Sequence, residues 1–128
     1  MKRKLTKILL WIAAAFFLFE AILHGFGLNL LEHDKIFLPT HDRYIALFAL
    51  TYATLLLLIS TNLKKYDTLF KLIMAGLLLA ILNATLISYT GGYKAFSTVN
   101  LDRELRHIGI AAYIWYPLTL IAYRLEKN

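Results

Sequence analysis

The sequence predicts an all-α integral membrane protein, a bundle of four transmembrane helices with both termini on the cytoplasmic side. Hydrophobic residues make up 59% of the 128-residue chain. A soluble domain of this size leaves about a third of its unfolded surface in contact with water, which does not suit such a composition. The hydrophobic residues gather in four runs, 8–31, 44–63, 72–93 and 107–123. Because roughly 20 apolar residues cover ~30 Å of hydrocarbon as a helix, each run can cross a bilayer, and residues 1–128 form one domain.

The first helix is expected at residues 5–28. Its apolar run continues well past the short core of a cleavable signal peptide, and its one charged residue is Glu20. His24 follows four residues later, a spacing that brings two side chains together on one helix face. A carboxylate inside hydrocarbon costs roughly 3 kcal/mol or more, so we expect Glu20 to have a partner or a chemical role.

The second helix is expected at residues 42–63, after a long polar connection. Asp42 is a good residue to cap its first turn, and His41 precedes it at the same end. The polar turn over residues 61–68 is short, which makes the second and third helices antiparallel neighbours. His41 and Asp42 therefore lie at the end of the bundle opposite the chain termini.

The third helix is expected at residues 68–90. At ~1.5 Å per residue, Asn83 reaches about the same depth as Glu20 in the first helix. Small residues four apart form a packing surface beside it, so we expect Asn83 to point inward and to hydrogen-bond to Glu20. The small residues are Gly76, Ala80 and Ala84.

The fourth helix is expected at residues 101–124. Arg103 and His107 are four residues apart and so share a face, at the end of the helix that lies on the same side as His24. Each of three helices then presents a histidine near one depth. The candidate ligand pocket on this outer side consists of Glu20 and His24 as catalytic acid–base residues, together with Asn83, His41, Asp42, Arg103 and His107.

The orientation follows from the basic residues, because lysine and arginine near helix ends are retained on the cytoplasmic side. Nine of the 14 flank the side that carries both termini, and five flank the other side. The protein is therefore expected in the plasma membrane with its termini inside. The net charge of +6 is scattered over helix ends rather than gathered on one face, which argues against nucleic-acid binding.

A metal or haem is an alternative use of the histidines. His24, His41 and His107 could supply nitrogen ligands to a divalent metal such as zinc, and His24 with His107 could hold a b-type haem. The only support for such a site in the sequence is the similar depth of these histidines on different helices, since no HExxH motif is present. The chain has no cysteine, which removes disulfides and thiolate ligands.

Three function classes stay open. The first is a bundle that binds or transforms a small ligand at the outer pocket. The second is a non-catalytic accessory subunit of a larger membrane complex. The third is an oligomeric transporter, for which the expected broken helices and inverted repeats are not evident. The expected partners are membrane lipid, a second copy of the chain or a larger complex.

Overall fold

The fold consists of four α-helices in the order that the sequence predicts. The computed structural model describes residues 4–28, 30, 39–90 and 101–127, but not the side chains of residues 88, 101–107 and 127. Each helix begins and ends within three residues of the prediction, and within the described residues there is no strand. The helices are α1 (Lys4–Phe26), α2 (Pro39–Thr61), α3 (Asp67–Tyr89) and α4 (Leu101–Lys127).

Each of the four helices contains a stretch that is long and apolar enough to cross a membrane. The stretches cover 23, 23, 21 and 19 residues, and a helix of 20 residues spans about 30 Å. The expected set of four apolar helices, each long enough to span a membrane, is confirmed. The four stretches are Lys4–Phe26, Pro39–Thr61, Asp67–Ile87 and Ile108–Glu126.

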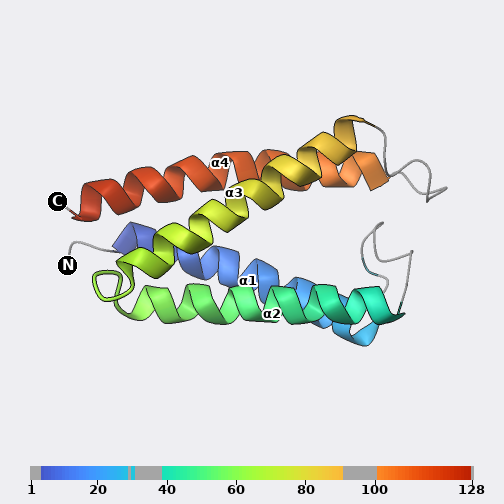
Figure 1. Ribbon diagram of the computed structural model, residues 1–128, viewed down its shortest axis with the longest axis horizontal. Coiled ribbons are helices and arrows are strands. Elements are labelled where there is room, and N and C mark those ends of the chain that lie inside the picture. The colour runs from blue at the N-terminus through green and yellow to red at the C-terminus, as the bar shows by residue number, and fades with distance from the viewer. Residues whose placement is uncertain (1–3, 29, 31–38, 91–100, 128) are drawn as a thin grey trace.

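The helices form two antiparallel pairs. α1 and α2 share the most extensive interface, α3 and α4 the next, and the contacts of α1 with α4 and of α2 with α3 are smaller. Figure 1 shows that both chain ends and the α2–α3 turn lie at the same end of the bundle, and that α3 diverges from α2 on leaving this turn. We call this the terminal end, and the opposite one the distal end.

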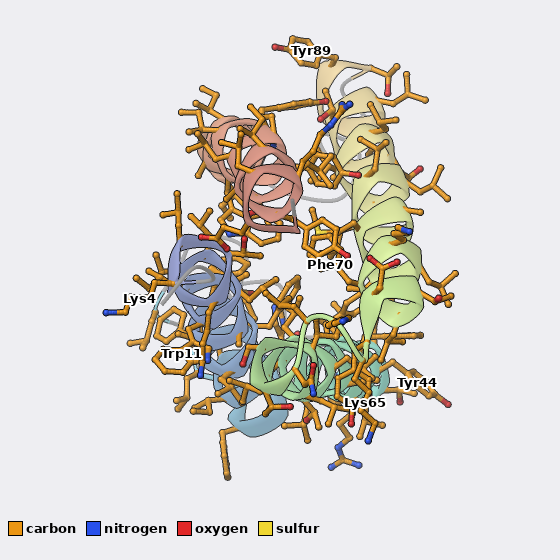
Figure 2. The ribbon with its side chains drawn as sticks, turned by 90° about the vertical axis from the view of Figure 1, so that its left-hand side faces the viewer. Lys4, Trp11, Tyr44, Lys65, Phe70 and Tyr89 are labelled. Carbon is orange, nitrogen blue, oxygen red and sulfur yellow. The ribbon has the colours of Figure 1, made fainter. Side chains whose placement is uncertain are left out.

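The hydrophobic core lies in the terminal half. Figure 2 looks onto this end and shows Phe70 pointing in among the helices, while Lys4 and Lys65 point away. Phe70 stacks on Tyr123 of α4 with ring centroids 4.1 Å apart. At the distal end, burial is found mainly between α1 and α2. The core residues are Leu10, Ala13, Ala14, Leu56, Ile59, Leu63, Phe70, Ile73, Met74 and Leu77.

A carboxylate closes the bundle at the terminal end. The first amides of a helix lack partners within the helix, and two of those in α1 donate to the side chain of Glu126 in α4. Leu5 N lies 2.9 Å from Glu126 Oε1, and Thr6 N lies 3.2 Å from Glu126 Oε2. A negative charge is also favourable at the positive end of the α1 dipole. Glu126 therefore caps α1 from the far end of the chain.

Candidate functional site

The distal end of α1 is shaped by a glycine. Gly27 has a φ of 64°, a left-handed conformation that costs glycine little and other residues more. Beyond it, Leu28 N donates to Leu23 O over 2.9 Å, which is the long bond of a Schellman motif. α1 therefore ends at Phe26, and His24 lies in its last turn.

The first turn of α2 lies beside the last turn of α1. Pro39 opens α2, a position at which its fixed φ suits a helix and its missing N–H is not needed. Asp42 lies in this first turn and is buried, with 4% of its surface exposed. A carboxylate is favourable at the positive N-terminus of a helix, and an imidazolium is favourable at a negative C-terminus. The ends of the two helices therefore favour an acid on α2 opposite a base on α1.

His24 connects two carboxylates. Its Nδ1 lies 2.6 Å from Asp42 Oδ1, and its Nε2 lies 3.4 Å from Glu20 Oε2 one turn earlier in α1. Glu20 and His24 are 9% and 7% exposed, so the three side chains form a buried acid–imidazole–acid cluster. The expected proximity of Glu20 to His24 is present, and Asp42 joins them from α2. We call these three residues the distal cluster.

The cluster can hold and move a proton. A neutral imidazole has one N–H donor and one acceptor nitrogen, and only an imidazolium donates from both. The short contact with Asp42 favours the proton on Nδ1, because a neighbouring carboxylate fixes which ring nitrogen is protonated. Nε2 then faces Glu20 as the acceptor or, after protonation, as a second donor. Proton exchange is therefore possible between His24 and Glu20.

His41 lies outside the cluster although it adjoins Asp42 in sequence. Successive residues of a helix are ~100° apart, so when Asp42 turns towards α1 its neighbour turns elsewhere, and His41 is exposed. Arg103 and His107 belong to α4, but their side chains lie outside the described residues. Of the three histidines expected to converge, His24 is in the cluster, His41 is exposed away from it, and the place of the His107 side chain stays a prediction.

Asn83 also lies apart from the cluster. Its side chain is exposed on α3, and within the described part of the chain it makes no hydrogen bond, so the expected bond to Glu20 is not formed. The prediction paired Asn83 with Glu20 because the two residues lie at a similar depth in the bundle. A similar depth does not determine how a helix is rotated about its axis. α3 turns Phe70 and Leu77 to the core, and Asn83 lies about 120° around the helix from Leu77.

The metal and haem sites considered above include His107, whose side chain lies outside the described residues, so they stay predictions; the described histidines show no metal site. Both ring nitrogens of His24 face carboxylate oxygens, so in this arrangement neither is directed at a metal ion. His41 is exposed on another face of α2. Across the described ranges, no group of three or more His, Asp or Glu residues is arranged to hold a metal. The distal cluster is better suited to proton chemistry than to ligation.

Sequence reasoning missed the polar contacts between helices at the terminal half. Trp115 of α4 donates its indole N–H to Leu9 O over 2.8 Å, and Trp11 of α1 donates to Ser60 Oγ of α2 over 2.9 Å. Further out, Thr85 Oγ1 and Tyr113 Oη lie 2.9 Å apart and connect α3 with α4. The sequence did contain a signal for these contacts: indole and hydroxyl groups inside an apolar helix usually form hydrogen bonds when they are buried.

Comparison with known proteins adds no relative to this description. No protein-family model, no curated protein and no solved structure matches the chain.

Proposed function

We propose that the protein is a multi-pass membrane protein in which the distal cluster binds a small ligand and exchanges a proton with it. The observation that carries this proposal is the contact of one imidazole with two carboxylates, His24 with Glu20 and Asp42, between two helices that are long and apolar enough to span a membrane. The roles are distinct: Glu20 and His24 exchange the proton, and Asp42 positions the ring.

Stability alone is a poor explanation for the cluster. Ionisable side chains inside a membrane are costly and mark functional sites by default. Buried ion pairs can often be replaced by apolar residues of similar volume without loss of stability. α1 and α2 share the most extensive interface of the bundle, and Leu23 of α1 and Ala49 and Ala53 of α2 are buried, which are residue types that can hold helices together without charge. We infer that the three polar groups serve a reaction or a ligand.

The proton exchange follows from the contacts of the ring. Asp42 accepts the Nδ1–H hydrogen bond and keeps the acceptor nitrogen directed at Glu20. A ligand that delivers a proton to the Glu20 carboxylate allows this proton to pass on to Nε2, which leaves Glu20 as a carboxylate again and His24 as an imidazolium between two carboxylates. Loss of that proton to the ligand returns the cluster to its first state. Apart from the ligand, both steps need only Glu20, His24 and Asp42. The low dielectric around these side chains strengthens each hydrogen bond.

The proposed orientation places this site on the outer side of the plasma membrane. Nine of the 14 lysines and arginines flank the terminal side in the sequence, and basic residues near helix ends stay cytoplasmic. In this orientation α1 and α3 run outward, and the distal cluster faces the exterior. The basic residues on the terminal side are Lys2, Arg3, Lys4, Lys7, Lys64, Lys65, Lys71, Arg124 and Lys127.

Native mass spectrometry tests the proposal. The protein is extracted from its native membrane in mild detergent, and any small molecule that copurifies with it is identified. We expect a bound molecule in the wild type that is lost in Glu20→Gln and in His24→Phe. Asp67→Asn is the matched control, because Asp67 pairs with Lys71 at the exposed terminal end over 2.7 Å. Equal occupancy in all four proteins would contradict a ligand site here and favour the accessory-subunit alternative.

A further inference from the structure

An exposed amide within a membrane-spanning segment of α3 points to an interface. Asn83 lies within the apolar stretch Asp67–Ile87 and is exposed, with no hydrogen bond in the described part of the chain. Exposed leucines on a membrane helix are ordinary, since lipid tails are as apolar as leucine. An amide is different, because hydrocarbon offers neither donors nor acceptors to it. The Asn83 amide therefore needs a hydrogen-bonding partner, and a group of a second chain can supply it.

The Asn83 side chain cannot satisfy its hydrogen-bonding groups by reaching up to the membrane surface. Asn83 lies four residues before the end of the apolar stretch, about 6 Å by the helix rise. Side chains on a helix tilt towards its N-terminus, and α3 begins at the terminal end. The amide is therefore directed away from the nearer membrane surface. Leu86, one turn beyond it, is 64% exposed and keeps its surroundings apolar.

The residues around Asn83 have the spacing of a helix–helix contact. Leu72, Leu79 and Leu86 follow at intervals of seven and are each about two-thirds exposed. Asn83 lies four residues after Leu79 and three before Leu86, so it occupies an a position in a heptad whose d positions are leucines. A single polar residue at an a position is a known determinant of register and of a two-stranded state.

We propose that α3 pairs in parallel with α3 of a second copy of this chain, and that the two Asn83 amides hydrogen-bond across the two-fold axis. Identical chains inserted in one orientation are parallel, and a two-fold interface places each residue near its own copy. A carboxamide suits this arrangement because it carries both a donor and an acceptor. The same group on both sides is therefore self-complementary.

The shape of the bundle leaves room for this contact in the distal half. At Gly76, the next a position towards the terminal end, the helix is already covered by α2: a Cβ placed there would lie 3.1 Å from Tyr52 Oη. Beyond that point α3 diverges from α2 (Figure 1). The contact between copies is therefore centred on Leu79, Asn83 and Leu86. It does not involve the distal cluster, and of the proposed function it rests only on the insertion of the helices in a membrane.

Single-cysteine cross-linking in vesicles tests the geometry, because the 128-residue chain has no cysteine of its own. Asn83→Cys and Leu79→Cys are compared with Leu78→Cys, an exposed position at neighbouring depth that lies about 100° around the helix from Leu79. After reconstitution into phosphatidylcholine vesicles and oxidation, we expect disulfide-linked dimers at positions 79 and 83 but few at 78. Equal cross-linking at all three positions, or none, would overturn the proposal.

The role of the amide is tested without cysteine. Fluorescence energy transfer between labelled copies, diluted with lipid, gives the apparent dimer dissociation constant. Interhelical hydrogen bonds in membranes are individually modest, so we expect Asn83→Leu to raise that constant roughly tenfold. Asn83→Gln should restore most of the affinity. An unchanged constant in Asn83→Leu, or association only with a different protein in native membranes, would refute the pairing.

Discussion

His24 Nδ1 lies 2.6 Å from Asp42 Oδ1, although the two residues are 18 positions apart and belong to different helices. The contact joins the last turn of α1 to the first turn of α2, where the two helix dipoles favour a base and an acid respectively. It therefore fixes the rotation of one helix against the other at the distal end. Glu20 on the opposite side of the ring turns this structural contact into a possible site of proton exchange.

Removal of Asp42 should destabilise the bundle. Asp42→Ala leaves the buried ring of His24 without this acceptor, and breaking a buried pair in this way costs about 3 kcal/mol. Asp42→Asn retains an acceptor oxygen, and we expect it to cost about 1 kcal/mol. The free energy of unfolding, measured in mixed micelles, gives both values. His41→Ala is the control at the adjacent exposed position and should change it by less than about 0.5 kcal/mol.

The turn that ends α1 should not tolerate a side chain. Gly27 has φ 64°, so Gly27→Ala should lower the free energy of unfolding by about 1 kcal/mol. Gly109 of α4 provides the comparison, because a Cβ there meets no atom within 4 Å. Gly109→Ala should be neutral or slightly stabilising. Thermal unfolding of both variants measures the difference, and equal losses would show that the left-handed turn is unimportant.

Glu126 should slow hydrogen exchange at the backbone amides of the first turn of α1. Glu126→Ala removes the acceptor of the Leu5 and Thr6 amides, and loss of a helix cap costs about 1 kcal/mol. Hydrogen exchange should accelerate at these two amides and not at the distal end of α1. Asp67→Ala removes a carboxylate from the same end of the bundle and should leave them protected. Unchanged exchange in Glu126→Ala would contradict the capping role.

The indole of Trp11 and the hydroxyl of Ser60 should be energetically coupled. Their hydrogen bond of 2.9 Å joins α1 to α2, and such bonds contribute about 0.6 kcal/mol on average inside membranes. A double-mutant cycle with Trp11→Phe and Ser60→Ala isolates this value from packing effects. A coupling energy of zero would mean that each group finds an equally good partner when the other is removed.

The sequence predicted the elements of this fold well and their rotations less well. Length and hydropathy were sufficient for the four helices, and a spacing of four was sufficient to bring Glu20 next to His24. The rotation of α3 was not accessible, because it depends on which residues the core selects. Phe70 and Leu77 occupy the core, and Asn83 is consequently turned outward. The row of small residues beside Asn83 had suggested the opposite.

The pairing of His24 with Asp42 shows the same limit at finer scale. His41 and Asp42 were equally good members of an outer pocket by position, and each could have faced α1. Only the packing of α1 against α2 decides which of the two neighbours is buried. Sequence patterns predict depth and spacing along a helix, whereas contacts between helices decide which side chains meet.

The cap formed by Glu126 also implies an order of assembly during synthesis. α1 is made first, and its Leu5 and Thr6 amides can be bonded to water while the following helices are still being translated. They meet Glu126 only when α4 has been synthesised and has reached its place beside α1. The hydrogen bonds to this carboxylate can therefore form only after all four helices have been made and α4 has packed against α1.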